Sequence, residues 1–262
     1  MKMKQKMLIL LFAAVLVIAF FAPTQNVRQV NLANTLENPS IEHPFGTDNL
    51  GRDVFSLMVE GLMRTLMVVV IATFVSFVVG ILLGVISGYY GGIVGGVIQF
   101  VSDFTLILPP LICALILTAI IGFNPISIGF ILGFTHIGEY TNQTTILCRS
   151  IRQSGYVESA IQCGIPSFLI ILRHVLPNVL NPLLTFMGNR ASGVTISYAS
   201  LAFIGLGADI TNPDWGSMIY QYRTYIFDKT LLLLWPSLGI LFLSLFFHFM
   251  FDDSNSKDLD IT

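Results

Sequence analysis

The sequence predicts an all-α fold, a polytopic membrane helical bundle with six transmembrane helices. Of its 262 residues, 54% are hydrophobic and only 11% are charged. Its mean hydropathy is +0.79, and the apolar residues form long runs separated by short polar segments. Soluble domains carry about 25% charged residues, so this composition indicates an integral membrane protein. The net charge of −2 and the absence of a dense Lys/Arg stripe argue against nucleic-acid binding.

The first apolar run, residues 7–22, follows Lys2, Lys4 and Lys6. This pattern fits either a signal peptide or a first membrane anchor. An anchor is favoured, because the residues before Pro23 lack the small-x-small pattern of a cleavage site. The three lysines then place the N-terminus in the cytoplasm by the positive-inside rule.

Residues 24–53 are polar, and by alternation they lie outside the membrane. We expect a structured extracellular loop in which Gly46 and Gly51 form turns and Asp48 or Asp53 caps the following helix. Direct contact of this loop with a ligand or a binding protein is the alternative.

The second span, residues 66–88, contains no charged residue and is long enough to cross the hydrocarbon core. Residues 54–65 lead into it as an amphipathic helix, in which Glu60 and Arg64 have the spacing of a helical ion pair. We therefore divide the chain into residues 1–65, an anchor helix with an extracellular loop, and residues 66–262, the core of the bundle.

The third and fourth spans are predicted at residues 93–121 and 126–148, on either side of a turn that contains Gly and Pro. Pro109 and Pro110 should kink the third span, as is tolerated within a bundle. The fourth span ends near Arg149 and Arg152, which place that end on the cytoplasmic side.

Residues 156–178 form a polar, helix-forming insert between long apolar runs. Gly164 and Pro166 should end one short helix and start a second, because these residues punctuate helices. We call this segment the handle and expect it to lie on the cytoplasmic surface. The fifth and sixth spans follow at residues 179–207 and 231–251, joined by an outer loop, so the C-terminus is also cytoplasmic.

Four ordered motifs resemble one family. The handle resembles the Glu-Ala-Ala loop of ABC-importer permease subunits, with Ser159 at its second position. His43 to Asp53, read as HPFGTDNLGRD, are similar to an N-terminal motif of the peptide and nickel branch. Two further matches, residues 201–207 and 213–216, follow late in the chain. The branch often has charged residues where Phe100, Asn142, Thr145 and Tyr198 stand here, so these positions leave the substrate open.

This resemblance implies the permease fold of a type I ABC importer, with residues 66–262 as the permease core. Its ATPase-coupling residues would be Glu158, Ser159, Ala160, Gly164, Leu176 and Pro177. Its partners would be a second, B-type permease, two ATP-binding subunits that hold ATP and Mg²⁺, an extracytoplasmic solute-binding protein and membrane lipid. The chain itself would be the C-type permease and import di- or oligopeptides, or alternatively nickel, cobalt or a metal chelate.

The sequence contains no phosphate-binding P-loop, no His-Glu-x-x-His and no Gly-x-Ser-x-Gly motif. We therefore expect no catalytic residue, no metal site and no cofactor in this chain, which is not an enzyme. Cys113, Cys148 and Cys163 have no metal-site or disulfide spacing and are interpreted as buried small side chains. A secondary transporter coupled through intramembrane charges is an alternative of a different class.

Three charged residues, Asp103, Glu139 and Arg190, fall deep inside predicted spans. Such charges are costly in lipid, about 2.5–3.5 kcal/mol each, so they should face one another or a wet cavity. Counted from the inner ends of their spans, Asp103 and Arg190 lie at similar depths in the membrane, which makes an ion pair between the third and fifth spans feasible. The residues either hold the bundle together or line the substrate path. His136, one turn from Glu139, is a packing residue or, alternatively, a ligand for a metal in transit.

Overall fold

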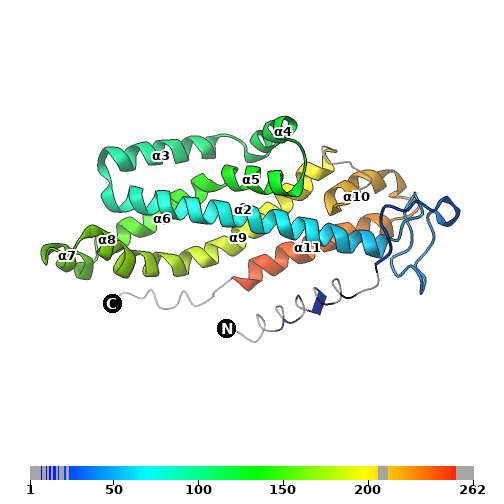
Figure 1. Ribbon diagram of the computed structural model, residues 1–262, viewed down its shortest axis with the longest axis horizontal. Helices are drawn as coiled ribbons and strands as arrows, with labels where there is room; N and C mark the ends of the chain where they lie inside the picture. The colour runs from blue at the N-terminus through cyan, green and yellow to red at the C-terminus, as the bar shows by residue number, and fades with distance from the viewer. Residues whose placement is uncertain are drawn as a thin grey trace.

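The computed structural model describes residues 24–205 and 212–251, together with seven residues near the N-terminus, Met7, Leu10, Phe12, Ala14, Val15, Val17 and Phe21. Within these residues the fold is helical and contains no β-strand, only one isolated bridge between Thr47 and Asp53. Figure 1 shows most of the helices running side by side along one long axis. The elements are η1 (Leu32–Asn34), α2 (Val54–Tyr90), α3 (Gly92–Ile107), α4 (Pro110–Ile121), α5 (Pro125–Thr135), α6 (Ile137–Arg152), α7 (Gly155–Gln162), α8 (Ser167–Ile170), the π-helical turn η2 (Ile171–Val175), α9 (Leu176–Phe203), α10 (Trp215–Tyr222), η3 (Arg223–Tyr225) and α11 (Leu231–Met250).

Helix α2 is the longest element and starts where the sequence predicts a cap. The Asp53 carboxylate accepts a hydrogen bond from the backbone N–H of Ser56 at 2.8 Å, which confirms the predicted capping by Asp53. The helix continues unbroken to Tyr90. The predicted division of the chain between residues 65 and 66 therefore falls inside a helix. Glu60 and Arg64 form the expected ion pair at 3.6 Å.

Close packing of α2 on α6 depends on three glycines spaced four residues apart. An added Cβ at Gly80, Gly84 or Gly88 would lie 2.3, 2.4 or 2.7 Å from the Cβ atoms of Tyr140, Thr144 and Cys148, respectively. Small residues at this spacing let two helix backbones approach closely, which is a common packing mode in membranes. The polar α6 is thus held against the apolar α2.

The third predicted span is broken, not merely kinked. Helices α3 and α4 meet at an angle of 87°. Leu108 and Pro109 both have extended backbones, because a residue that precedes proline is disfavoured in the helical region and two prolines follow in succession. The expectation of one kinked helix over residues 93–121 was therefore wrong.

The fourth predicted span consists of two helices, because α5 ends at Thr135 and α6 begins at Ile137. His136 lies between them and caps both. Within the described part of the chain, three helices are long and apolar enough to cross a membrane: Val54–Tyr90, Ser167–Phe203 and Leu231–Met250. The bent pair α3 and α4 would make a fourth. Most of the first predicted span (7–22), residues 206–211 with part of the motif at 201–207, and the tail from residue 252 lie outside the described residues.

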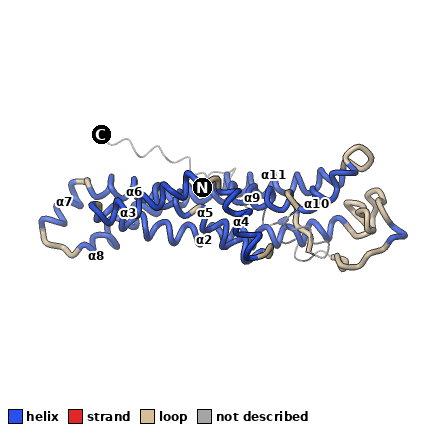
Figure 2. Tube along the Cα trace, turned by 90° about the horizontal axis from the view of Figure 1, so that it is seen from above, coloured by secondary structure: helices blue, strands red, loops and turns tan. Residues whose placement is uncertain are grey.

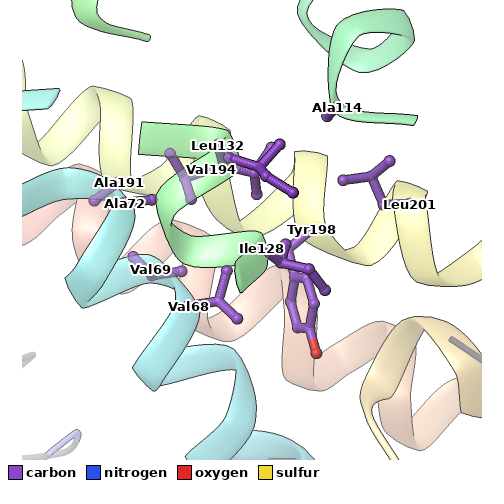
Figure 3. Close-up of a cluster of buried hydrophobic side chains, with 11 residues drawn as sticks. Val68, Val69, Ala72, Ala114, Ile128, Leu132, Ala191, Val194, Tyr198 and Leu201 are labelled. Atoms are coloured by element: carbon purple, nitrogen blue, oxygen red, sulfur yellow. The ribbon is translucent and has the colours of Figure 1, made fainter. Parts of the chain in front are cut away.

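The centre of the bundle is apolar. Helices α2, α5 and α9 meet in a buried cluster, which Figure 3 shows together with Ala114 from α4. It comprises Val68, Val69, Ala72, Ala114, Ile128, Ile131, Leu132, Ala191, Val194, Tyr198 and Leu201. Phe12, from the first predicted span, stacks on Phe246 of α11 with ring centroids 3.6 Å apart.

The two ends of the bundle differ. Figure 2 shows the long loop that precedes α2 at one end, near α10, and the turns around α7 and α8 at the other. The loop is fixed by a buried ion pair between Asp48 and Arg52 at 2.7 Å, and the hydroxyl of Tyr222 donates to the same carboxylate oxygen at 3.3 Å. Burial raises the pKa of Tyr222 well above its usual value, so this hydroxyl stays protonated and remains a donor. Gly46 and Gly51 have positive φ, as the predicted turns require.

Candidate functional site

The handle, residues 156–178, begins with α7, which ends in the turn that the sequence predicts. Gly164 has a φ of 74°. Its N–H donates to the carbonyl of Ile161 at 3.0 Å, and the N–H of Ile165 donates to the carbonyl of Ala160 at 3.2 Å. This pair of bonds is a Schellman motif, which needs a residue in the left-handed region and is therefore usually built on glycine. The predicted role of Gly164 as a turn is confirmed.

The inner face of the handle is packed into the bundle. Val157 and Ala160 of α7 join one buried cluster with residues of three long helices. The long-helix members are Ile81, Val85 and Tyr89 of α2, Cys148 of α6, and Val179 and Leu183 of α9; Ile170 and Val175 contribute from the second half of the handle. The handle and these helices therefore share one close-packed apolar cluster.

The outer face of the handle is exposed and partly apolar. Phe168 is 67% exposed. The exposed fractions of Ile161, Ile165 and Leu172 are 43%, 38% and 44%. Glu158 and Ser159 are also on the exposed side, and the Ser159 hydroxyl donates to the carbonyl of Gly155 at 2.8 Å.

The remaining coupling residues occupy three different settings. Ala160 is buried, so its small side chain permits close packing between the handle and the bundle. Leu176 is half-buried and Pro177 is exposed at the start of α9. Nearby, the side-chain amide of Asn178 donates to the carbonyl of His174 at 2.7 Å and to the Tyr156 hydroxyl at 3.4 Å, which braces the two ends of the handle.

A second set of polar side chains crosses the middle of the bundle. We call it the polar belt, and it consists of Gln99 and Asp103 on α3, His136, Glu139 and Asn142 at α6, and Arg190 on α9. The Glu139 carboxylate receives Arg190 at 2.7 Å and lies 3.2 Å from the Nδ1 atom of His136. The guanidinium of Arg190 also lies over the Phe186 ring, 4.7 Å from its centroid.

The predicted ion pair between Asp103 and Arg190 was wrong. Helix α6 packs against both α3 and α9 and lies between them, so Glu139 meets Arg190 first. Asp103 instead accepts hydrogen bonds at 3.0 Å from the side-chain amides of Gln99 and Asn142. These two amides also contact each other.

Gln99 and Asn142 are the members of the belt that the sequence reading missed. Gln99 precedes Asp103 by four residues, which is the spacing of neighbours on one helix face and was the available signal. Asn142 follows Glu139 by three residues and shares its face for the same reason. Within residues 24–205 and 212–251, no group of three His, Cys, Asp or Glu side chains is placed to hold a metal ion.

Comparisons with known proteins agree with these features. The family described as binding-protein-dependent transport system inner membrane component matches residues 80–252. The glutathione transport system permease protein GsiD of Shigella flexneri serotype 5b (strain 8401) is 31% identical over 244 residues, which cover 93% of this chain and 80% of the relative. The protein of the same name from Escherichia coli O1:K1 / APEC is 29% identical over the same share of both chains. The chain therefore belongs to the binding-protein-dependent transport system inner membrane components and is an inner-membrane permease of an ABC importer of the peptide and nickel branch, not an enzyme, with ATP hydrolysis carried out by a separate subunit.

Proposed function

We propose that this chain is the C-type permease of an importer that moves di- or oligopeptides across the membrane by ATP-driven alternating access. In this proposal it pairs with a B-type permease and with two ATP-binding subunits, which hold ATP and Mg²⁺. An extracytoplasmic solute-binding protein delivers the ligand to the loop end of the bundle. Both termini and the handle are cytoplasmic, as the positions of Arg149 and Arg152 before the handle favour.

The observation that carries the proposal is the two-sided construction of the handle. Its inner face packs against α2, α6 and α9. Its outer face exposes Ile161, Ile165, Phe168 and Leu172 at the end of the bundle. An exposed apolar patch on a segment that lies outside the membrane commonly marks a site where another protein binds. A motor subunit bound there would therefore act on three long helices at once.

Substrate passage is assigned to the polar belt. Asp103, Glu139 and Arg190 lie on helices of a bundle with an apolar core, and charged groups in such a setting are retained for function or for pairing. Closure of the ATP-binding subunits would draw the handle of this chain toward that of the second permease. The long helices would then rock, which exposes the belt alternately to the two sides.

A peptide substrate is supported by the relatives, whose names assign glutathione transport to them. Glutathione is itself a small peptide. Nickel, cobalt or a metal chelate is the alternative ligand. Uptake of a radiolabelled dipeptide and of ⁶³Ni²⁺ by cells with and without the chain distinguishes the two.

The coupling role is tested by replacing Gly164 with leucine. An added Cβ at Gly164 meets nothing within 4 Å, so the new side chain starts in open space and projects toward the surface where the motor would bind. We expect ligand-stimulated ATP hydrolysis of the complete reconstituted importer to fall about tenfold, the effect of losing about 1.4 kcal/mol of interaction.

The matched control is Gly91→Leu. Gly91 also has a positive φ, 62°, and open space before its Cβ position, but it lies in the turn between α2 and α3. Both substitutions therefore place a side chain at a positive φ, and the strain is larger at Gly91, whose ψ is −144°. Equal ATP hydrolysis by the Gly164→Leu and Gly91→Leu complexes would show that the handle does not receive the motor.

A further inference from the structure

Helix α6 carries a polar face at the depth of the belt. This face holds the half-buried side chains of Glu139, Asn142 and Gln143, and the exposed Ile146 separates them from Arg149; the opposite side of the helix packs on α2. Lipid would not solvate this face, since polar and charged side chains in a membrane turn toward protein or water. From Glu139 to Gln143 the polar face extends about 6 Å at about 1.5 Å per residue, which suits a water-filled route at the depth of the belt.

Helix α3 faces this route with a narrow stripe of small and polar residues. Gly92, Gly96, Gln99 and Asp103 recur at spacings of four, three and four residues, which places them on one side of the helix. The hydrogen bond from Asn142 to Asp103 shows that this stripe adjoins α6. The other exposed residues of α3 are large and apolar, among them Ile93, Val97, Phe100 and Phe104.

The charges of the belt do not cancel. Arg190 forms an ion pair with Glu139 at 2.7 Å, so the carboxylate of Asp103 is a belt charge without a counter-charge from Arg190. Asp103 is exposed, and in the described part of the chain no Lys, Arg or His lies within ion-pair distance of it. Both of its hydrogen bonds come from neutral amides and end on the same oxygen, Oδ1.

We propose that Asp103 is the residue of the translocation route that recognises a positively charged ammonium group on the ligand. This inference rests on the proposed function, because it identifies what the belt contacts during transport. Gln99 and Asn142 fix the carboxylate through Oδ1, and Oδ2 is presented to the route. A carboxylate that accepts a hydrogen bond from an ammonium group makes one of the stronger polar contacts available to a protein. At the depth of the belt, the unmatched carboxylate of Asp103 also favours cations over anions.

Cysteine reactivity in the complete importer tests the proposal without knowledge of the natural ligand. The background carries Cys113→Ala and Cys163→Ser and keeps the buried Cys148. Gly96→Cys is the reporter, because an added Cβ there meets nothing within 4 Å. The probes are a cationic thiosulfonate with a trimethylammonium group and an anionic one with a sulfonate group, applied without nucleotide to purified complex in lipid nanodiscs. The cationic probe is itself a small ammonium compound.

We expect Gly96→Cys to react with both probes. We expect Asp103→Asn to lower the cation-to-anion rate ratio about tenfold, since the two probes differ by two charges in their interaction with one carboxylate about 10 Å along α3 in a poorly screened site. Asp103→Glu should keep the ratio within about twofold of the original, because the charge is retained. Val97→Cys is the matched control. Val97 is 58% exposed on the apolar side of α3 and should react with neither probe.

An unchanged rate ratio in Asp103→Asn would overturn the proposal. So would a Gly96→Cys as unreactive as Val97→Cys, which would mean that the stripe is covered by lipid or by a partner subunit. If the Gly96 variant does not assemble, Gly193→Cys serves as a second reporter, because it lies on α9 near Arg190 and also has open space before its Cβ position. The labelling rates involve no ATP hydrolysis, so a failure here is distinct from a failure of the handle to couple.

Discussion

At the scale of single residues, Glu139 is the centre of the polar belt. One of its carboxylate oxygens, Oε2, meets both Arg190 and the Nδ1 atom of His136. Removal of one partner from such a group leaves a charge at membrane depth without its counter-charge, whereas removal of both charges does not. The belt is therefore sensitive to single substitutions and tolerant of a matched double one.

A double-mutant cycle tests this pairing. Arg190→Met should destabilise the purified protein by about 2–3 kcal/mol, the usual cost of an unmatched charge within a membrane span. Adding Glu139→Gln should restore about 1–2 kcal/mol of that loss, as groups in direct contact are coupled. The measurement is the free energy of unfolding in mild detergent.

The control cycle combines Arg190→Met with Asp103→Asn. Because α6 separates these two side chains, their effects should add to within about 0.5 kcal/mol. A coupling between Asp103 and Arg190 as large as that between Glu139 and Arg190 would contradict the arrangement described above.

At the scale of elements, the contact between α2 and α6 depends on the absence of side chains. Gly80, Gly84 and Gly88 bring the backbone of α2 against Tyr140, Thr144 and Cys148. This contact holds α6 in place even though α6 carries too many polar groups to be stable against lipid. The same contact orients Glu139 and Asn142 toward α3 and α9.

Gly84→Leu should separate the two helices. An added Cβ at Gly84 lies 2.4 Å from the Cβ of Thr144 and 2.7 Å from the carbonyl oxygen of Thr141, so a backbone must move. We expect a loss of about 2–3 kcal/mol in stability, as is typical of overpacking. Gly96→Leu, which introduces the same side chain into open space, should change the midpoint of thermal unfolding by less than about 2 °C. Equal losses in both variants would show that the glycines of α2 are not a packing surface.

At the scale of the whole molecule, the loop, the polar belt and the handle lie at different positions along the length of the bundle. The loop of residues 24–53 is held on α10 by Asp48 and Tyr222 at one end, and the handle occupies the other end. The polar belt lies between them. Helices α2, α6 and α9 contribute to the apolar cluster that holds the handle, and α6 and α9 also carry residues of the belt, so the two features share helices.

Transport should accordingly require the complete importer. Vesicles that contain both permeases, the ATP-binding subunits and the binding protein should transport a labelled dipeptide when ATP is supplied on the side of the membrane that carries the ATP-binding subunits. Vesicles that contain this chain alone should not. Uptake by the chain alone, abolished by a protonophore, would instead point to a secondary transporter that uses its intramembrane charges.

Several features follow from the sequence because each depends on few neighbouring residues. The apolar run at 66–88 lies within α2, Asp53 caps that helix, and Gly164 ends α7 in a left-handed turn. Backbone conformation at glycine, hydrogen bonding at a helix start and the hydropathy of a span are local properties. The membrane class, the cap of α2 and the turn that ends α7 could therefore be predicted from the chain alone.

The tertiary structure decided which side chains meet. Depth along a span can be counted from the sequence, but successive residues turn by about 100° around a helix, and the order of helices in the bundle sets which faces are adjacent. For this reason only the packed structure places Glu139 against Arg190 and Asn142 against Asp103, and buries Ala160. The 87° angle between α3 and α4 is also set by packing. Two successive prolines predict that the helix is disrupted, but the surrounding helices fix the angle.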